Sequence, residues 1–143
     1  WFVSFNATWQ KSLDYSRYIA GTNTESETYK MQLPHIPILF FNWMLDYRKD
    51  NPFGGKGQYA RAYYEGGYTD KYYYGYELSR NQDYKIPSTC LHTVGMEYGI
   101  MNRKILFGVE CHNLFDTDEM TNFNYPLAGR TIMAKIRFTT LKW

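Results

Sequence analysis

Residues 1–15 read WFVSFNATWQKSLDY and alternate between apolar and polar side chains. The odd positions carry the apolar set Trp1, Val3, Phe5, Ala7, Trp9, Leu13 and Tyr15. The even positions carry Ser4, Asn6, Thr8, Gln10 and Ser12, and Lys11 is the polar residue on the apolar side. Successive side chains of a strand point to opposite faces, so this pattern predicts a β-strand with one apolar face.

The same alternation returns in five later stretches. They are residues 36–48, 58–74, 89–98, 104–114 and 132–139. Beyond them the parity slips before Leu141 and Trp143, which predicts a bulge or an irregular end. No stretch has a helical period, so we expect an all-β chain of six antiparallel strands.

The connections between these strands alternate in length. Polar loops cover 16–34 and 75–85 and the segment that runs up to Gly129, whereas shorter breaks follow residue 48 and residue 98. Outer-membrane barrels combine long extracellular loops with short periplasmic turns. The alternation therefore favours a transmembrane β-barrel segment over the other interpretation, a water-soluble antiparallel sandwich or barrel.

The composition is compatible with a barrel wall. Aromatic residues make up 20% of the chain, and such residues suit pleated surfaces and membrane interfaces. The mean hydropathy of −0.56 is low, as in barrels whose alternate residues face a wet lumen. The net charge of +2 comes without a clustered basic patch, so we expect no nucleic-acid partner.

Charged residues recur at the polar positions of the expected strands and should line the barrel interior. They are Asp46, Arg48, Arg61, Glu65, Glu97, Lys104, Glu110, Lys135 and Arg137. Two interpretations are open: these side chains pair with a plug inside the lumen, or they pair with one another on neighbouring strands.

The tail carries the most distinctive motif. Asn113-Leu114-Phe115-Asp116 is followed by a polar loop and then by Tyr125-Pro126-Leu127-Ala128-Gly129-Arg130-Thr131. Asparagine and aspartate can bond nearby backbone and close a strand end. Proline suits a strand entry, and glycine permits a close approach. Turn chemistry is therefore the direct interpretation of these residues.

The two motifs resemble the end of TonB-dependent outer-membrane receptors, in which they close the penultimate strand and open the last one. The resemblance implies that residues 1–143 are the C-terminal part of a barrel of 22 strands in the bacterial outer membrane. Its partners would be the remaining strands, a plug domain, the TonB complex and membrane lipid. Its cargo would be a scarce nutrient such as ferric siderophore, haem or cobalamin. Six strands cannot close such a barrel, and the chain begins at Trp1 rather than Met, so we expect a fragment.

Candidate cargo contacts are few. Tyr72, Tyr74 and Tyr76 follow a tyrosine-rich strand and could stack on a ligand, although packing within an aromatic girdle explains them as well. His112 should face the lumen. The three histidines lack the spacing of a metal site, so we expect neither a metal nor another cofactor.

Two other functions compete with energised uptake. One is a passive barrel that acts as a porin or an adhesin. The other is an enzyme barrel such as a lipase, which needs a serine beside His92 on the outward face. No serine stands at a suitable position there, so we expect no enzyme.

The two cysteines fall on the same face of adjacent expected strands. A turn centred between Ile100 and Met101 would place Cys90 opposite Cys111, within reach of a disulfide. A turn centred one residue later would pair His92 with Cys111 and leave two free thiols. Both outcomes are open at this point.

Overall fold

A computed structural model describes residues 1–75, 85–122 and 125–140 of the chain, without the side chains of 121, 122 and 125. The described chain is all-β and contains no helix, hence none long and apolar enough to cross a membrane. Its main sheet has six strands. They are β1 (Phe2–Trp9), β2 (Leu39–Asp50), β3 (Tyr59–Thr69), β6 (Thr89–Ile100), β7 (Ile105–His112) and β10 (Thr131–Phe138).

The six strands form an antiparallel meander, in which each strand pairs with the strands of this sheet that precede and follow it along the chain. The order is β1-β2-β3-β6-β7-β10. Two small pairs lie in the loops, β4 (Tyr72–Tyr73) with β5 (Lys85–Ile86), and β8 (Met120–Asn122) with β9 (Tyr125–Pro126). The expected six antiparallel strands are confirmed, while the irregularity expected at Leu141 and Trp143 lies outside the described residues.

The strand boundaries differ from the sequence prediction, most of all in the first and third strands. The first strand ends at Trp9 and not at residue 15, because its ladder with β2 ends where Trp9 faces Leu39. The chain then runs out as an irregular hairpin held by bridges from Leu13 to Gln32 and from Tyr18 to Glu25. The third strand ends at Thr69, and its tyrosine-rich continuation pairs with β5 instead.

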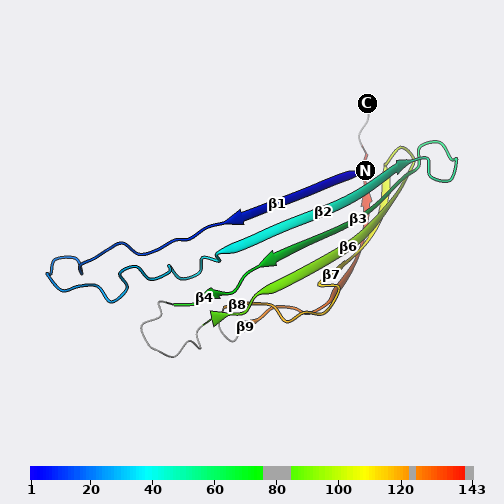
Figure 1. Cartoon of the computed structure of the whole chain (residues 1–143). Helices are drawn as coiled ribbons and strands as arrows, with labels where there is room; N and C mark the ends of the chain where they lie inside the picture. Colours follow the sequence, from blue (N-terminus) through cyan, green and yellow to red (C-terminus); the bar gives the residue numbers. More distant parts are fainter. Residues whose placement is uncertain (76–84, 123–124, 141–143) are drawn as a thin grey trace.

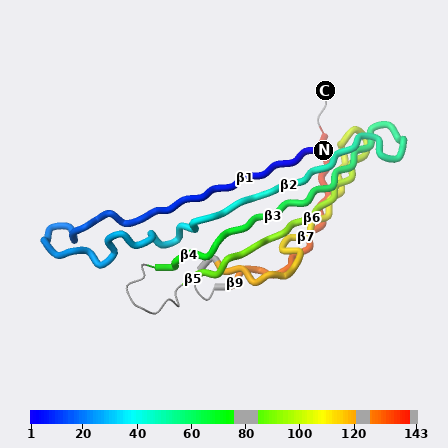
Figure 2. Tube along the Cα trace, viewed as in Figure 1, coloured from blue at the N-terminus to red at the C-terminus, as the bar shows by residue number. Residues whose placement is uncertain are grey.

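Long and short connections lie at opposite ends of the sheet (Figure 1). The segments 10–38, 70–88 and 113–130 connect strands at one end, which we call the loop end. The segments 51–58 and 101–104 connect them at the other end, which we call the turn end. The trace in Figure 2 follows the strands between these two ends as one twisted sheet, with β1 and β10 as its outermost strands.

The two faces of this sheet differ in polarity and in burial. Residues opposite one another on neighbouring strands share a face, and one such row joins Val3, Leu45, Tyr64, Val94, Cys111 and Ile132. We call this side the apolar face. Its side chains are widely exposed: Trp9 is 74%, Ile132 70% and Met96 64% accessible. On the other side, the polar face, Asp46 is only 1% accessible.

The turn between β6 and β7 contradicts both registers considered for the cysteines, but agrees with the alternative of two free thiols. Strand β6 continues to Ile100, which pairs with Ile105, so the turn covers 101–104. Met101, Asn102 and Arg103 all adopt positive φ angles, and the Asn102 N–H donates to the Gly57 carbonyl at 2.9 Å. Cys111 therefore lies opposite Val94, whereas Cys90 lies opposite Tyr68 on β3. Both cysteines are free thiols, and the proposed disulfide is wrong.

Thiol labelling tests this register. The unreduced, denatured chain should react with a maleimide at both Cys90 and Cys111, since their strands are shifted too far for a bond. Mass spectrometry of the peptides gives the labelled fraction at each site. Protection of both cysteines that disappears on reduction would contradict the register.

Candidate ligand-binding face of the sheet

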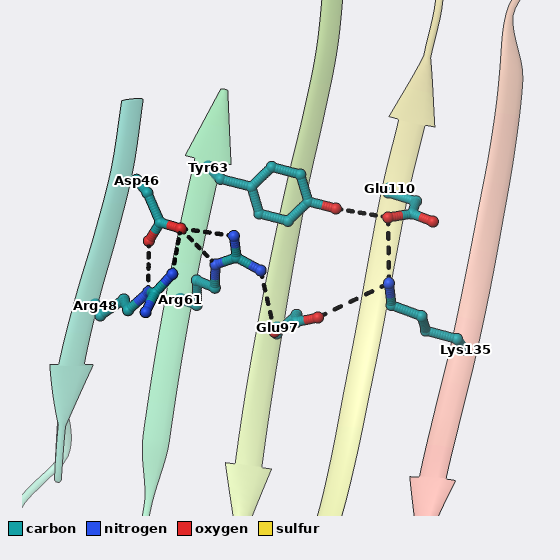
Figure 3. Close-up of polar contacts among 7 residues, drawn as sticks. All are labelled: Asp46, Arg48, Arg61, Tyr63, Glu97, Glu110 and Lys135. Carbon is teal, nitrogen blue, oxygen red and sulfur yellow. Dashed lines mark hydrogen bonds and ion pairs between the residues drawn. The ribbon is translucent and has the colours of Figure 1, made fainter. Parts of the chain in front are cut away.

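Ion pairs cross the turn-end half of the polar face (Figure 3). Arg48 holds the Asp46 carboxylate with two hydrogen bonds of 2.9 Å, and Arg61 Nη2 lies 2.6 Å from the same group. Arg61 also reaches Glu97, with Nη1 3.7 Å from Oε2. Because Arg61 belongs to β3 and Glu97 to β6, the contacts connect strands across the sheet. The buried Asp46 charge is thus compensated by two guanidinium groups.

The network continues through two long side chains that lie across glycines. Tyr63 faces Gly95 on β6 and extends over it, so that its hydroxyl donates to Glu110 Oε2 on β7 at 2.5 Å. A Cβ on Gly95 would lie 2.2 Å from the Tyr63 ring. A side chain larger than hydrogen at position 95 would therefore block this cross-strand bond.

Lys135 on β10 uses a second glycine in the same way. It faces Gly108 on β7, and a Cβ there would lie 2.9 Å from Lys135 Cε. Its Nζ reaches Glu110 at 3.2 Å and Glu97 at 3.8 Å. We call the connected set the charge ladder: Asp46, Arg48, Arg61, Tyr63, Glu97, Glu110 and Lys135.

The ladder shows which groups most of the charged residues expected in the interior pair with inside the chain. Its six charged members pair with one another, Asp46 and Arg48 within β2 and the others between strands, as one of the two interpretations held. Lys104 lies in the 101–104 turn rather than in a strand. Glu65 stays outside the ladder, and Arg137 lies beside Glu97 and Lys135 along a small cleft.

The loop-end half of the polar face is different, because it holds a hollow of about 500 Å³. Hydroxyl, amide and carboxylate side chains surround it. The polar ones are Ser4, Asn6, Asn42, Glu65, Thr69, Thr89, Thr93 and Glu119. The sequence prediction missed this group, although its strand members stand at the polar positions of the alternation. Small polar residues carry no signal that distinguishes a binding surface from a wet wall.

His112 is at the edge of this hollow, on the polar face where the sequence placed it. Its Nδ1 lies 3.4 Å from the hydroxyl of Thr93, which lines the hollow. Its Nε2 lies 3.5 Å from Glu110 Oε1, an ion pair when the imidazole is protonated. His112 therefore connects the hollow to the charge ladder.

The loop tyrosines gather around a histidine that the prediction did not assign to a site. The His35 ring lies 5.2 Å from Tyr74 and 6.4 Å from Tyr72, and its backbone N–H donates to the Tyr73 carbonyl. Burial raises the pKa of Tyr72, and the nearby Glu119 carboxylate raises it further. Strand β4 of this cluster pairs with β5, and β5 contacts β8, which directly follows Glu119 of the hollow. Tyr76 lies outside the described residues.

The apolar face carries its own aromatic group near the loop end. His92 contacts the Trp43 ring at 5.4 Å and the Phe115 ring at 4.7 Å, and its Nδ1 lies 2.6 Å from the Tyr64 hydroxyl. The thiol of Cys90 lies 3.4 Å from His92 Nε2. A tryptophan, a tyrosine and a histidine with one polar tip each match the residues that collect at a membrane–water boundary.

The two tail motifs meet in space through backbone contacts. Asn113 adopts a positive φ of 50° and bonds Thr117 in both directions at 2.8 Å. Asp116 Oδ1 accepts a hydrogen bond from the Arg130 N–H at 2.7 Å. A Cβ on Gly129 would lie only 2.6 Å from the same oxygen, so glycine allows this close approach. The expected turn chemistry and close glycine approach are confirmed.

The remaining motif residues support the same loop. The Leu114 N–H donates to the His92 carbonyl at 2.8 Å, which fastens the start of the loop to β6. Tyr125 and Pro126 form β9 and pair with Asn122 and Met120.

In comparisons with known proteins, no protein-family model, no curated protein and no solved structure matches the chain. Among the described residues, no three His, Cys, Asp or Glu side chains come together as they would around a metal ion.

Replacing Gly95 tests the charge ladder. Gly95→Ala should displace the Tyr63 ring, break its bond to Glu110 and lower the free energy of unfolding by about 1–3 kcal/mol. Gly75→Ala is the matched control, because no atom of the described residues lies within 4 Å of a Cβ there and its φ is not positive. Urea titration of the folded protein measures both.

The same experiment separates the bond from general crowding at position 95. If the loss comes from the Tyr63–Glu110 bond, then Gly95→Ala should cost much less in a Tyr63→Phe background. An equal cost in both backgrounds would refute the role assigned to the bond.

Proposed function

We propose that this chain is part of the wall of an outer-membrane active transporter, which imports a scarce nutrient with energy supplied through TonB. The observation that carries the proposal is the inverted polarity of the sheet. Large apolar side chains such as Trp9 and Ile132 are exposed on one face, while the other face carries the charge ladder around the buried Asp46. Such an extended apolar face is far beyond the scattered exposed residues of a water-soluble monomer, and lipid covers it naturally.

The ends of the sheet support the same proposal. Long loops at one end and short turns at the other match the extracellular and periplasmic sides of such barrels. The aromatic group around His92 lies toward the loop end and would mark the outer membrane–water boundary. In the described residues β1 and β10 each leave an edge unpaired, and further strands would pair with them.

Import of a specific cargo, rather than passive diffusion, is supported by the resemblance of the tail motifs to TonB-dependent receptors. The hollow and the ring cluster of His35, Tyr72 and Tyr74 add a surface suited to a ligand at the loop end. A wide passive pore has no need of such a surface.

The lipid-facing assignment predicts costs of different size for the same substitution at two exposed apolar residues. Val109 on the apolar face and Met133 on the polar face are 51% and 43% accessible. Val109→Arg should lower the free energy of unfolding in lipid bilayers by about 2–4 kcal/mol, because it places a charge in the hydrocarbon. Met133→Arg should cost less than about 1 kcal/mol, since it lies beside Glu110 on the wet side.

Folding into lipid vesicles, followed by urea titration, provides these two values. Equal costs at positions 109 and 133, or a stable monomer without detergent or lipid, would count against a membrane wall.

Uptake by cells separates energised from passive transport. Cells that produce the gene product carrying this chain would receive labelled ferric siderophores, haem, cobalamin and neutral oligosaccharides. One of these compounds should accumulate, and its accumulation should stop when a protonophore collapses the inner-membrane proton gradient. Uptake that continues unchanged under the protonophore would favour the passive porin-like barrel instead.

A further inference from the structure

The hollow at the loop end of the polar face has the size of a small-molecule site. Its volume of about 500 Å³ lies inside the range of roughly 300–1,000 Å³ usual for ligand pockets. Strands β1, β2, β3 and β6 all contribute to it, and Glu119 adds a carboxylate from the loop that follows β7. The rigid sheet thus supplies the floor, and the loop supplies one side.

Side chains in the hollow are free to bond a ligand, in contrast to those of the charge ladder. Within the part of the chain that the structure describes, the side chains of Asn6, Asn42 and Glu65 have no hydrogen-bond partner. Gly67 leaves room beside the Asn42 amide, since a Cβ there would lie 2.8 Å from Asn42 Oδ1. The amide groups can therefore meet a ligand without first breaking a protein bond.

The types of these groups define the ligand they fit. Asparagine amides and threonine hydroxyls both donate and accept, as the hydroxyls of a polyol do. When they are ionised, the carboxylates of Glu65 and Glu119 can accept hydrogen bonds but cannot donate them. They therefore require donors on the ligand. No lysine or arginine lines the hollow among the described residues. An anionic ligand would meet two carboxylates and no compensating charge.

The environment of Glu119 connects the hollow to an aromatic surface. Burial raises the pKa of Glu119, and its charge raises the pKa of Tyr72. The rings of Tyr72, Tyr74 and His35 lie toward this side of the hollow, because β4 pairs with β5 and β5 contacts β8, which directly follows Glu119. Aromatic rings beside hydrogen-bonding groups can pack on the apolar faces of a ring-shaped ligand.

We propose that the hollow binds a hydroxyl-rich, saccharide-like ligand that carries no negative charge. This inference rests on the proposed function, in which the polar face lines the lumen, and it narrows the cargo. It favours neutral or cationic hydroxylated compounds and disfavours haem and other carboxylated or sulfated ligands.

Three trisaccharides of similar size and different charge test the proposal. They are the uncharged trimer of N-acetylglucosamine, the trimer of glucosamine in mildly acidic buffer where its amines are protonated, and the trimer of galacturonic acid. Binding to the detergent-purified gene product that carries this chain is followed by saturation-transfer NMR and calorimetry. The first two should bind, and the anionic trimer should bind about tenfold more weakly or not at all, the effect of one unfavourable ionic contact.

Glu65→Gln should reduce this discrimination several-fold, because the variant should bind the cationic trimer more weakly and the anionic trimer more tightly. Glu65 makes no ion pair among the described residues, so this variant should fold normally, which circular dichroism verifies. Asp118→Asn is the matched control: it removes an equal charge from an exposed loop position outside the hollow and should change nothing.

Failure of this inference can be told apart from failure of the proposed function. Absence of binding by both the neutral and the cationic trimer overturns the inference, as does equal binding of the anionic one or an effect of Asp118→Asn as large as that of Glu65→Gln. Heat-modifiable gel mobility of the same preparations reports whether the barrel is folded in the membrane. A folded barrel without binding refutes only the ligand class, whereas a protein that never inserts refutes the proposed function.

Discussion

The ion pair between Asp46 and Arg61 is the interaction on which the polar face depends. A carboxylate that is 1% accessible must be compensated, and Arg61 brings its guanidinium to 2.6 Å from it while also reaching Glu97 on the next strand. From Glu97 the network passes to Lys135 and Glu110. Strands that share such contacts cannot slide, because a slip of one residue would move every member to the opposite face.

The ladder also explains how one sheet can serve two purposes. Near the turn end its charged groups pair with one another, and these ion pairs hold the strands of that half of the sheet together. Near the loop end, the side chains of Asn6, Asn42 and Glu65 have no partner in the described chain, and they line the hollow. If the chain forms part of a transporter as proposed, this division along the strands would separate a rigid half of the sheet from a half that can bind ligand.

The apolar face follows from the same alternation but has a different requirement. Its large side chains are only partly covered by the chain itself: Val109, Met96 and Ile132 are each more than half exposed. Removing their remaining exposed surface from water is favourable, and this requires another apolar surface or solvent to cover them. Under the proposed function, lipid would cover this face, while the other face carries charges that pair with one another.

The sequence by itself determined the strand number, the antiparallel order and the face of nearly every strand residue, because a period of two fixes the side to which a side chain points. It also predicted that Asp116 and Gly129 serve a turn. Only the tertiary structure decided the register across the 101–104 turn, since three positive φ angles there depend on contacts with the neighbouring turn. That register separated the cysteines, brought Tyr63 over Gly95 and gathered the hollow from residues far apart in the chain, relations that parity cannot fix.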